Sequence, residues 1–163
     1  MRDILFKTED GVFSYRVAGV CVKDGAVLLQ NTTTDPSLAF PGGHVAFGET
    51  NEQTLVREFA EEIGAVVKVG GLRWAAEVFF PWGDRRCHQI CLYYDVEIIG
   101  GDIPDSGSFT GREHMEGRDF DLRFHWIPIE ELGGTGREVY PTQCAELLKS
   151  GVSGPIHFVY REE

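Results

Sequence analysis

The chain has 163 residues, of which 42% are hydrophobic, and this composition suits one globular domain spanning residues 1–163. Its formal net charge of −11 disfavours nucleic acids and anionic membranes as partners, and it would also repel a phosphorylated substrate unless a divalent cation were bound. No apolar run approaches the roughly 20 residues of a membrane span, and residues 1–7 lack the apolar region of a secretory signal, so we expect a cytoplasmic protein.

The first predicted element is a β-hairpin. Apolar residues at 17–22 and 26–30 flank Lys23-Asp24-Gly25, and an Asp-Gly pair favours a tight turn between two strands. A loop follows at 32–37. A short buried strand is expected at 38–40, ended by Pro41-Gly42-Gly43.

The strongest local signal in the chain predicts a helix over residues 51–63. Thr50 and Gln53 form a capping box at its start. Leu55, Phe59 and Ile63 recur every four residues and give the helix one apolar face. Gly64 then stands where a glycine commonly ends a helix.

After this helix the pattern favours strands over helices. We expect strands at 65–69, 72–80, 88–99, 120–126 and 156–160, and a short helix at 141–150. Residues 100–119 are polar and begin with two glycines, so they predict a long, mobile loop that closes over a bound substrate. Because the strands do not alternate with helices, a mixed sheet with helices packed on it is the expected architecture.

Three glutamates on the predicted helix carry the chemistry. Glu58, Glu61 and Glu62 share one helix face, where their carboxylates repel each other unless a cation lies between them. Clustered oxygen ligands suit a hard cation such as Mg²⁺ or Mn²⁺. Taken alone, such a cluster is more often a solvent-facing acidic stripe. A metal site becomes the better interpretation because of the residues around the cluster, namely the preceding glycines, Glu49 and Arg57. Arg57 can pair with one of the acids and hold its orientation.

Residues 43–65 resemble the Nudix box, the 23-residue motif of the Nudix hydrolases. Phe59 and Ala65 depart mildly from its aliphatic positions, and the wider resemblance covers residues 17–150. The fixed positions of the box are filled by Gly43, Glu49, Arg57, Glu58, Glu61, Glu62 and Gly64.

The resemblance implies an α/β/α sandwich with a mixed central sheet. It also implies metal-dependent hydrolysis of a diphosphate linkage in a nucleotide, ADP-ribose, a dinucleoside polyphosphate or a sugar nucleotide. By the family pattern Glu58 and Glu62 bind Mg²⁺ or Mn²⁺ directly, with Glu61 and a backbone carbonyl of Gly42 or Gly43 as further ligands. Glu49 and Arg57 then orient the metal-binding face.

The general base that accepts a proton from the attacking water is left open by the sequence. Within the family it is a glutamate of the box or an acid from a later loop, so the candidates are Glu58, Glu113 and Glu116. Trp82 is a candidate for stacking on a nucleobase, and Arg85 and Arg86 are candidates for binding phosphate. Core packing of the tryptophan and solvation of the arginines are the competing interpretations.

Two other functions compete with hydrolysis, namely a non-catalytic Nudix-fold binding module and an isomerase of isoprenoid diphosphates. The intact glutamate set argues against the first, and no further motif supports the second. A small-molecule substrate is the expected partner, and a homodimer is compatible with the sequence. Zinc at Cys87, His88 and Cys91 is disfavoured, and reduced core thiols are expected instead for the four cysteines.

Overall fold

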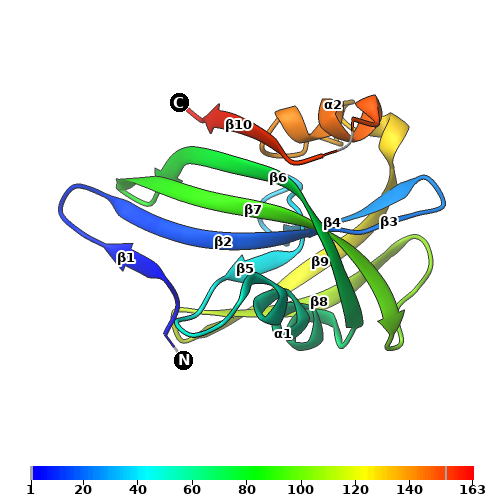
Figure 1. The fold of residues 1–163 in the computed structure, drawn as a ribbon, viewed down its shortest axis with the longest axis horizontal. Helices are drawn as coiled ribbons and strands as arrows, with labels where there is room; N and C mark the ends of the chain where they lie inside the picture. The colour runs from blue at the N-terminus through cyan, green and yellow to red at the C-terminus, as the bar shows by residue number, and fades with distance from the viewer. Residues whose placement is uncertain (1, 153) are drawn as a thin grey trace.

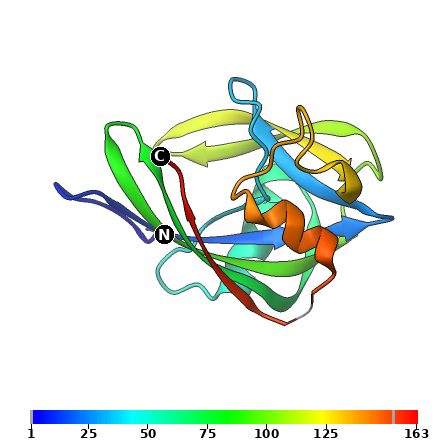
Figure 2. The same cartoon turned by 90° about the horizontal axis from the view of Figure 1, so that it is seen from above.

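The computed structural model describes residues 2–152 and 154–163 as two β-sheets between two helices (Figure 1). Helix α1 (Asn51–Ile63) lies on one side of the strands and α2 (Gln143–Ser150) on the other. Seen from above, α2 lies over the strands with β10 beside it (Figure 2). This arrangement confirms the predicted α/β/α sandwich with a mixed sheet.

The larger sheet is the mixed one, because β2 pairs with β7 and β10 with β6 in parallel, while its other pairs are antiparallel. Its strand order is β1 (Leu5–Lys7), β2 (Val12–Val20), β7 (Arg85–Gly100), β6 (Val66–Trp82) and β10 (Ile156–Arg161), with β5 (Gly42–His44) paired to β2.

The smaller sheet is antiparallel, and the short 3₁₀ helix η1 (Ile129–Glu131) follows its last strand. Its strand order is β3 (Val22–Lys23), β4 (Ala26–Thr32), β9 (Arg118–Pro128) and β8 (Ser108–Met115).

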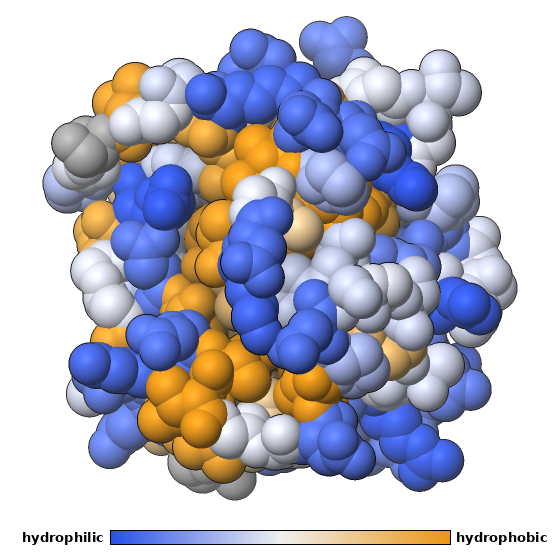
Figure 3. Space-filling view, turned by 90° about the vertical axis from the view of Figure 1, so that its right-hand side faces the viewer, coloured by the Kyte–Doolittle hydropathy of each residue, from blue (hydrophilic) through white to orange (hydrophobic). Residues whose placement is uncertain are grey.

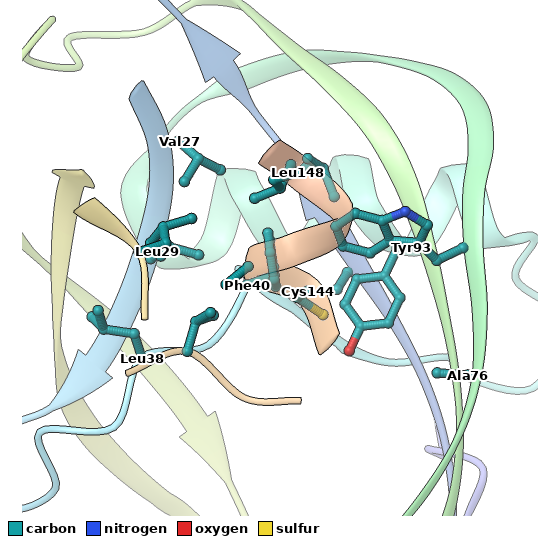
Figure 4. Packing of buried hydrophobic residues seen from close by; sticks show 14 of the residues in the cluster. Val27, Leu29, Leu38, Phe40, Ala76, Tyr93, Cys144 and Leu148 are labelled. Atoms are coloured by element: carbon teal, nitrogen blue, oxygen red, sulfur yellow. The ribbon is translucent and has the colours of Figure 1, made fainter. Parts of the chain in front are cut away.

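Strand alternation divides the core between the two helices. On β4, Val27 and Leu29 belong to the cluster beneath α2, whereas Leu28 belongs to the cluster beneath α1. Figure 4 shows the first cluster, with Val27 and Leu29 of β4 to the left of Leu148 of α2. Because successive side chains of a strand point to opposite faces, one strand supplies both cores.

Helix α1 begins and ends where the sequence predicts. The side chain of Thr50 accepts a hydrogen bond from the backbone N–H of Gln53, and the Gln53 side chain accepts one from Thr50 in return. Gly64 takes a left-handed conformation with φ of 69° and ends the helix. Leu55 and Phe59 are buried against the sheets, so the apolar face of the helix is also confirmed.

The predicted loop at 100–119 is wrong, because residues 108–115 form strand β8 paired with β9. Gly111 of β8 lies so close to α1 that an added Cβ would stand 2.6 Å from the carbonyl oxygen of Glu62. The inward positions of this strand therefore include a glycine and a glutamate, Glu113, which hid the apolar alternation that usually identifies a strand. Residues 108–115 therefore do not form a mobile lid.

The other differences are smaller and also involve glycine. The strand expected at 38–40 is reduced to isolated bridges, while Gly42–His44 pairs with β2 instead. An added Cβ on Gly42 would lie 2.0 Å from the carbonyl oxygen of Val17, so only glycine allows this close pairing. The strands expected at 65–69 and 72–80 are one strand, β6, with an irregularity near Gly70 and Gly71. The Asp-Gly hairpin turn is confirmed, with φ of 51° at Asp24 and 77° at Gly25.

Apolar side chains gather at the end of the molecule that lies on the right in Figure 1, as the space-filling view shows (Figure 3). A cavity of about 610 Å³ opens near this end between β3, the last residues of β7 and the segment 101–105. Lys23 and Asp105 form an ion pair at its rim. Within the described residues, no helix has the length and hydropathy needed to cross a membrane.

Candidate functional site

A cavity of about 590 Å³ brings the box glutamates together with the β8–β9 hairpin. Helix α1 contributes one wall and the hairpin the other, and the N-terminal segment closes one end. The cavity is lined by Asp3, Ala46, Arg57, Glu58, Glu61, Glu62, Arg112, Glu113, His114, Met115, Glu116 and Asp119.

Arg57 organises the acidic wall. Its Nε and Nη2 atoms each donate to Glu49 at 2.8 Å, which makes a bidentate pair. Its Nη1 atom donates to Glu58 at 2.9 Å and to Glu61 at 3.3 Å. The hydrogen bonds from Arg57 lower the pKa of Glu49, so this carboxylate stays ionised and fixes the guanidinium. Arg57 and Glu49 thus orient Glu58.

Three carboxyl groups of the cavity, those of Glu58 and Glu62 on α1 and of Glu113 on β8, are wholly or partly buried. Burial raises the pKa of Glu58 to about 7, although Arg57 opposes the shift. Burial and then the neighbouring carboxylates of Glu58 and Glu113 raise the pKa of Glu62 well above its ordinary value. The pKa of Glu113 is also raised by burial. Gathering such groups is costly in free energy unless protons or a cation neutralise them.

Two observations fit a hard cation here. Glu62 is 5% exposed, and its Oε1 atom has no hydrogen-bond partner among the described residues. At Gly43 an added Cβ would lie 2.3 Å from Cδ of Glu58, so the glycine makes room for this carboxylate against β5. Across residues 2–152 and 154–163, no three His, Cys, Asp or Glu side chains already stand in metal-binding geometry. Arg57 holds Glu58 and Glu61 by hydrogen bonds, and Glu62 lies one turn after Glu58 on the same helix.

The structure separates the two later acids that the sequence left as alternatives. Glu113 lies on β8, is partly buried and lowers the acidity of Glu62 through its charge. Glu116 lies at the turn of the hairpin, with φ of 53°, and forms an ion pair with Lys7. Both line the cavity, but only Glu113 faces the buried carboxyl groups.

Trp82, Arg85 and Arg86 do not line this cavity. Arg85 donates to the carbonyl oxygen of Thr8 at 3.2 Å, and Arg86 donates to that of Glu162 at 2.9 Å. The Trp82 ring lies 6.2 Å from the ring of His44, measured between centroids. Their roles in binding substrate remain predictions.

Sequence reasoning missed two polar residues beside the site, Arg16 and His44. Arg16 lies on β2 directly opposite His44 of β5. Burial, and then the charge of Arg16, lower the pKa of His44 to about 4, so its imidazole is neutral at pH 7. The only available signal was an arginine directly before the apolar run at 17–22, and it does not show what the Arg16 side chain contacts.

The four cysteines lie in the core. Cys21, Cys87, Cys91 and Cys144 are buried and free, as expected for reduced core thiols. Burial raises the pKa of the Cys87 thiol to about 11.

Known proteins resemble the chain in sequence and in fold. Residues 14–143 match the model of the NUDIX domain. An ADP-ribose pyrophosphatase of Methanocaldococcus jannaschii is 35% identical over 65% of this chain, which spans only 60% of that protein's length. A putative 8-oxo-dGTP diphosphatase 2 of Mycobacterium tuberculosis is 46% identical over 70% of this chain and 80% of its own length.

Solved structures support the fold alone, because their sequences are distant. The crystal structure of a mutator MutT protein from Bacillus halodurans superposes with a TM-score of 0.63 at 18% identity. The match covers 91% of this chain and 90% of that one.

Proposed function

This chain belongs to the Nudix family, and we propose that it is a metal-dependent pyrophosphohydrolase acting on a small nucleoside-diphosphate-type substrate. The observation that carries the proposal is the buried carboxyl cluster of Glu58, Glu62 and Glu113 at a glycine-lined strand edge. A non-catalytic binding module would have no use for a cluster that opposes its own folding.

Each residue of the site has a proposed task. Glu58 and Glu62, with Glu61 and the carbonyl of Gly43, would hold Mg²⁺ or Mn²⁺, while Glu49 and Arg57 keep Glu58 oriented. A cation bound there would neutralise phosphate oxygens and lower the pKa of a bound water. Glu113 faces this cluster from the opposite wall and is the proposed base that accepts the proton of the attacking water.

The relatives provide only a short set of candidate substrates. The two sequence relatives are named for ADP-ribose and for 8-oxo-dGTP. Both carry a diphosphate linkage to a nucleoside, which agrees with the substrate class implied by the box. We therefore place both in the assay, together with a dinucleoside polyphosphate and a sugar nucleotide.

The test is hydrolysis of this panel with Mg²⁺ or Mn²⁺, read as phosphate released after phosphatase treatment of the products. At least one substrate is expected to be cleaved, with a rate that rises toward alkaline pH because a bound water must lose a proton. Glu52→Gln is the control, since Glu52 is exposed on the same helix and outside the cavity. Full activity in excess EDTA, or no cleavage of any substrate, would refute the proposal.

We also propose that the protein works in the cytoplasm, a setting that agrees with four buried cysteines left as free thiols. Light scattering would distinguish a monomer from the homodimer that the sequence allows.

A further inference from the structure

Arg16 is a cation of the larger sheet that forms no ion pair with the described residues. It lies on β2 between Cys91 of β7 and His44 of β5, which are its direct neighbours across the sheet. Its Nη2 atom donates to the carbonyl oxygen of Phe40 at 2.7 Å, and its Nη1 atom lies 3.9 Å from Sγ of Cys91. Both contacts are to neutral groups.

The lack of a counter-ion distinguishes Arg16 from the cations around it. Within residues 2–152 and 154–163, no carboxylate oxygen lies within 4.0 Å of its guanidinium, whereas Arg57 pairs with Glu49 and Lys7 with Glu116. A guanidinium has five N–H donors, and its partial burial is costly while most of them lack an anionic partner. A protein of net charge −11 has ample carboxylates to pair with it, so the missing partner points to a ligand.

The surroundings of Arg16 connect it to the site. Its cross-strand neighbour His44 follows Gly43, which packs against Glu58, and the carbonyl oxygen of His44 accepts a hydrogen bond from Arg57 at 3.4 Å. His44 is neutral and therefore neither neutralises nor repels Arg16.

We propose that Arg16 binds a phosphate oxygen of the substrate, on the far side of the diphosphate from the box carboxylates. A guanidinium can donate two parallel hydrogen bonds to a phosphate and is the side chain best suited to it. This inference rests on the proposed function, because it assumes a diphosphate held at the carboxyl cluster. It differs from the family's box chemistry in that this contact needs no metal.

The test measures binding of inorganic pyrophosphate by isothermal titration in EDTA at low ionic strength. The dissociation constant is expected to rise about tenfold to a hundredfold in Arg16→Met, the range for one lost hydrogen bond between charged groups. Arg16→Lys should lie between this variant and the wild type, because it keeps the charge but not the forked donors. Thermal melting identifies any variant that has not folded, and Arg16→Lys then carries the test.

Arg73→Met is the matched control. Arg73 is also partly buried on the larger sheet, but its Nε atom donates to Asp95 at 2.7 Å, so its loss should leave the affinity for pyrophosphate unchanged. Equal affinity in the wild type and in both folded Arg16 variants would overturn the inference, and so would undetectable binding to the wild type.

These outcomes are separable from the fate of the proposed function. If the wild type hydrolyses a substrate of the panel while Arg16→Met binds pyrophosphate normally, the function stands and the inference fails. If no substrate is cleaved but Arg16→Met loses pyrophosphate affinity, the anion site stands without the hydrolase.

Discussion

At the scale of single residues, Glu58 and Glu62 lie one helical turn apart, Glu58 packs against Gly43, and both are largely withdrawn from solvent. Replacing either with glutamine keeps the shape but removes a charged oxygen ligand. We expect kcat to fall by on the order of 10² or more in each variant while the fold stays intact. Steady-state kinetics at saturating Mg²⁺, with circular dichroism for folding, check this. Near-wild-type turnover in either variant would exclude that residue as a ligand.

Glu113 and Glu116 give a paired test of where the base lies. Glu113→Gln should reduce kcat by on the order of 10² or more, because a general base is removed from the buried side of the cavity. Glu116→Gln should stay close to the wild type, since Glu116 is committed to Lys7 at the hairpin turn. The two variants serve as controls for each other. If neither alters kcat, the base is a glutamate of the box.

At this scale, the sequence could predict which site residues lie together only where those residues belong to one local segment. The acids of α1 could be placed together because helical spacing fixes which side chains share a face. Glu113 was only one of several candidates, since its position opposite α1 depends on a strand pairing that begins more than 40 residues after the box and that the residues themselves do not reveal. Arg16 was missed for the same reason, because its neighbours come from β5 and β7.

At the scale of elements, the fit of β8 against α1 depends on Gly111. An added Cβ there would lie 2.6 Å from Cε2 of Phe124 and 2.8 Å from Cγ2 of Ile63. Gly111→Ala is expected to destabilise the protein by about 1–3 kcal/mol through overpacking, which would lower Tm by roughly 2–4 °C per kcal/mol. Differential scanning calorimetry measures the shift.

Gly71→Ala is the control for that change, because an added Cβ on Gly71 meets nothing within 4 Å. It should change stability by no more than about 0.5 kcal/mol, as expected for an open surface position. An equal loss of Tm in the two variants would show that the effect belongs to glycine replacement in general and not to the contact with α1.

The contrast between α1 and β8 shows which elements a sequence can reveal. Every signal for α1 is local, namely its cap, its apolar period and its terminal glycine, and all of them are confirmed. The residues at the inward positions of β8 instead depend on their tertiary contacts. These contacts are the ring of Phe124, the backbone of α1 and the cavity. Tertiary packing thus overrides the local pattern in this strand.

At the scale of the whole molecule, the carboxyl cluster links stability to pH. Burial holds the pKa of Glu58 near 7, above the ordinary glutamate value of 4.5. A raised acid pKa favours the folded state below about pH 4.5, and this contribution is lost as the pH rises through 7. Without metal, the Tm of the wild type should therefore fall between pH 5.5 and 8 relative to that of Glu58→Gln.

Comparison with that variant is needed because His44 acts in the opposite direction. Its lowered pKa gives stability above about pH 6.5 that is lost as the pH falls toward 4. Mg²⁺ should raise the Tm of the wild type at pH 8 more than that of Glu58→Gln, since a bound cation stabilises the folded state by mass action. Parallel pH profiles for the two proteins would contradict a buried, proton-linked Glu58.

The passage of the chain from one sheet to the other at Cys21 has a consequence for how the molecule opens. Strand β2 pairs within the larger sheet, and β3 continues from it into the smaller one. The carbonyl of Cys21 accepts a hydrogen bond from the amide of Leu28, so the junction itself is tied to β4. Opening of one sheet should therefore disturb the other. We expect amide protons in β4 and β7 to exchange with deuterium with the same free energy of opening.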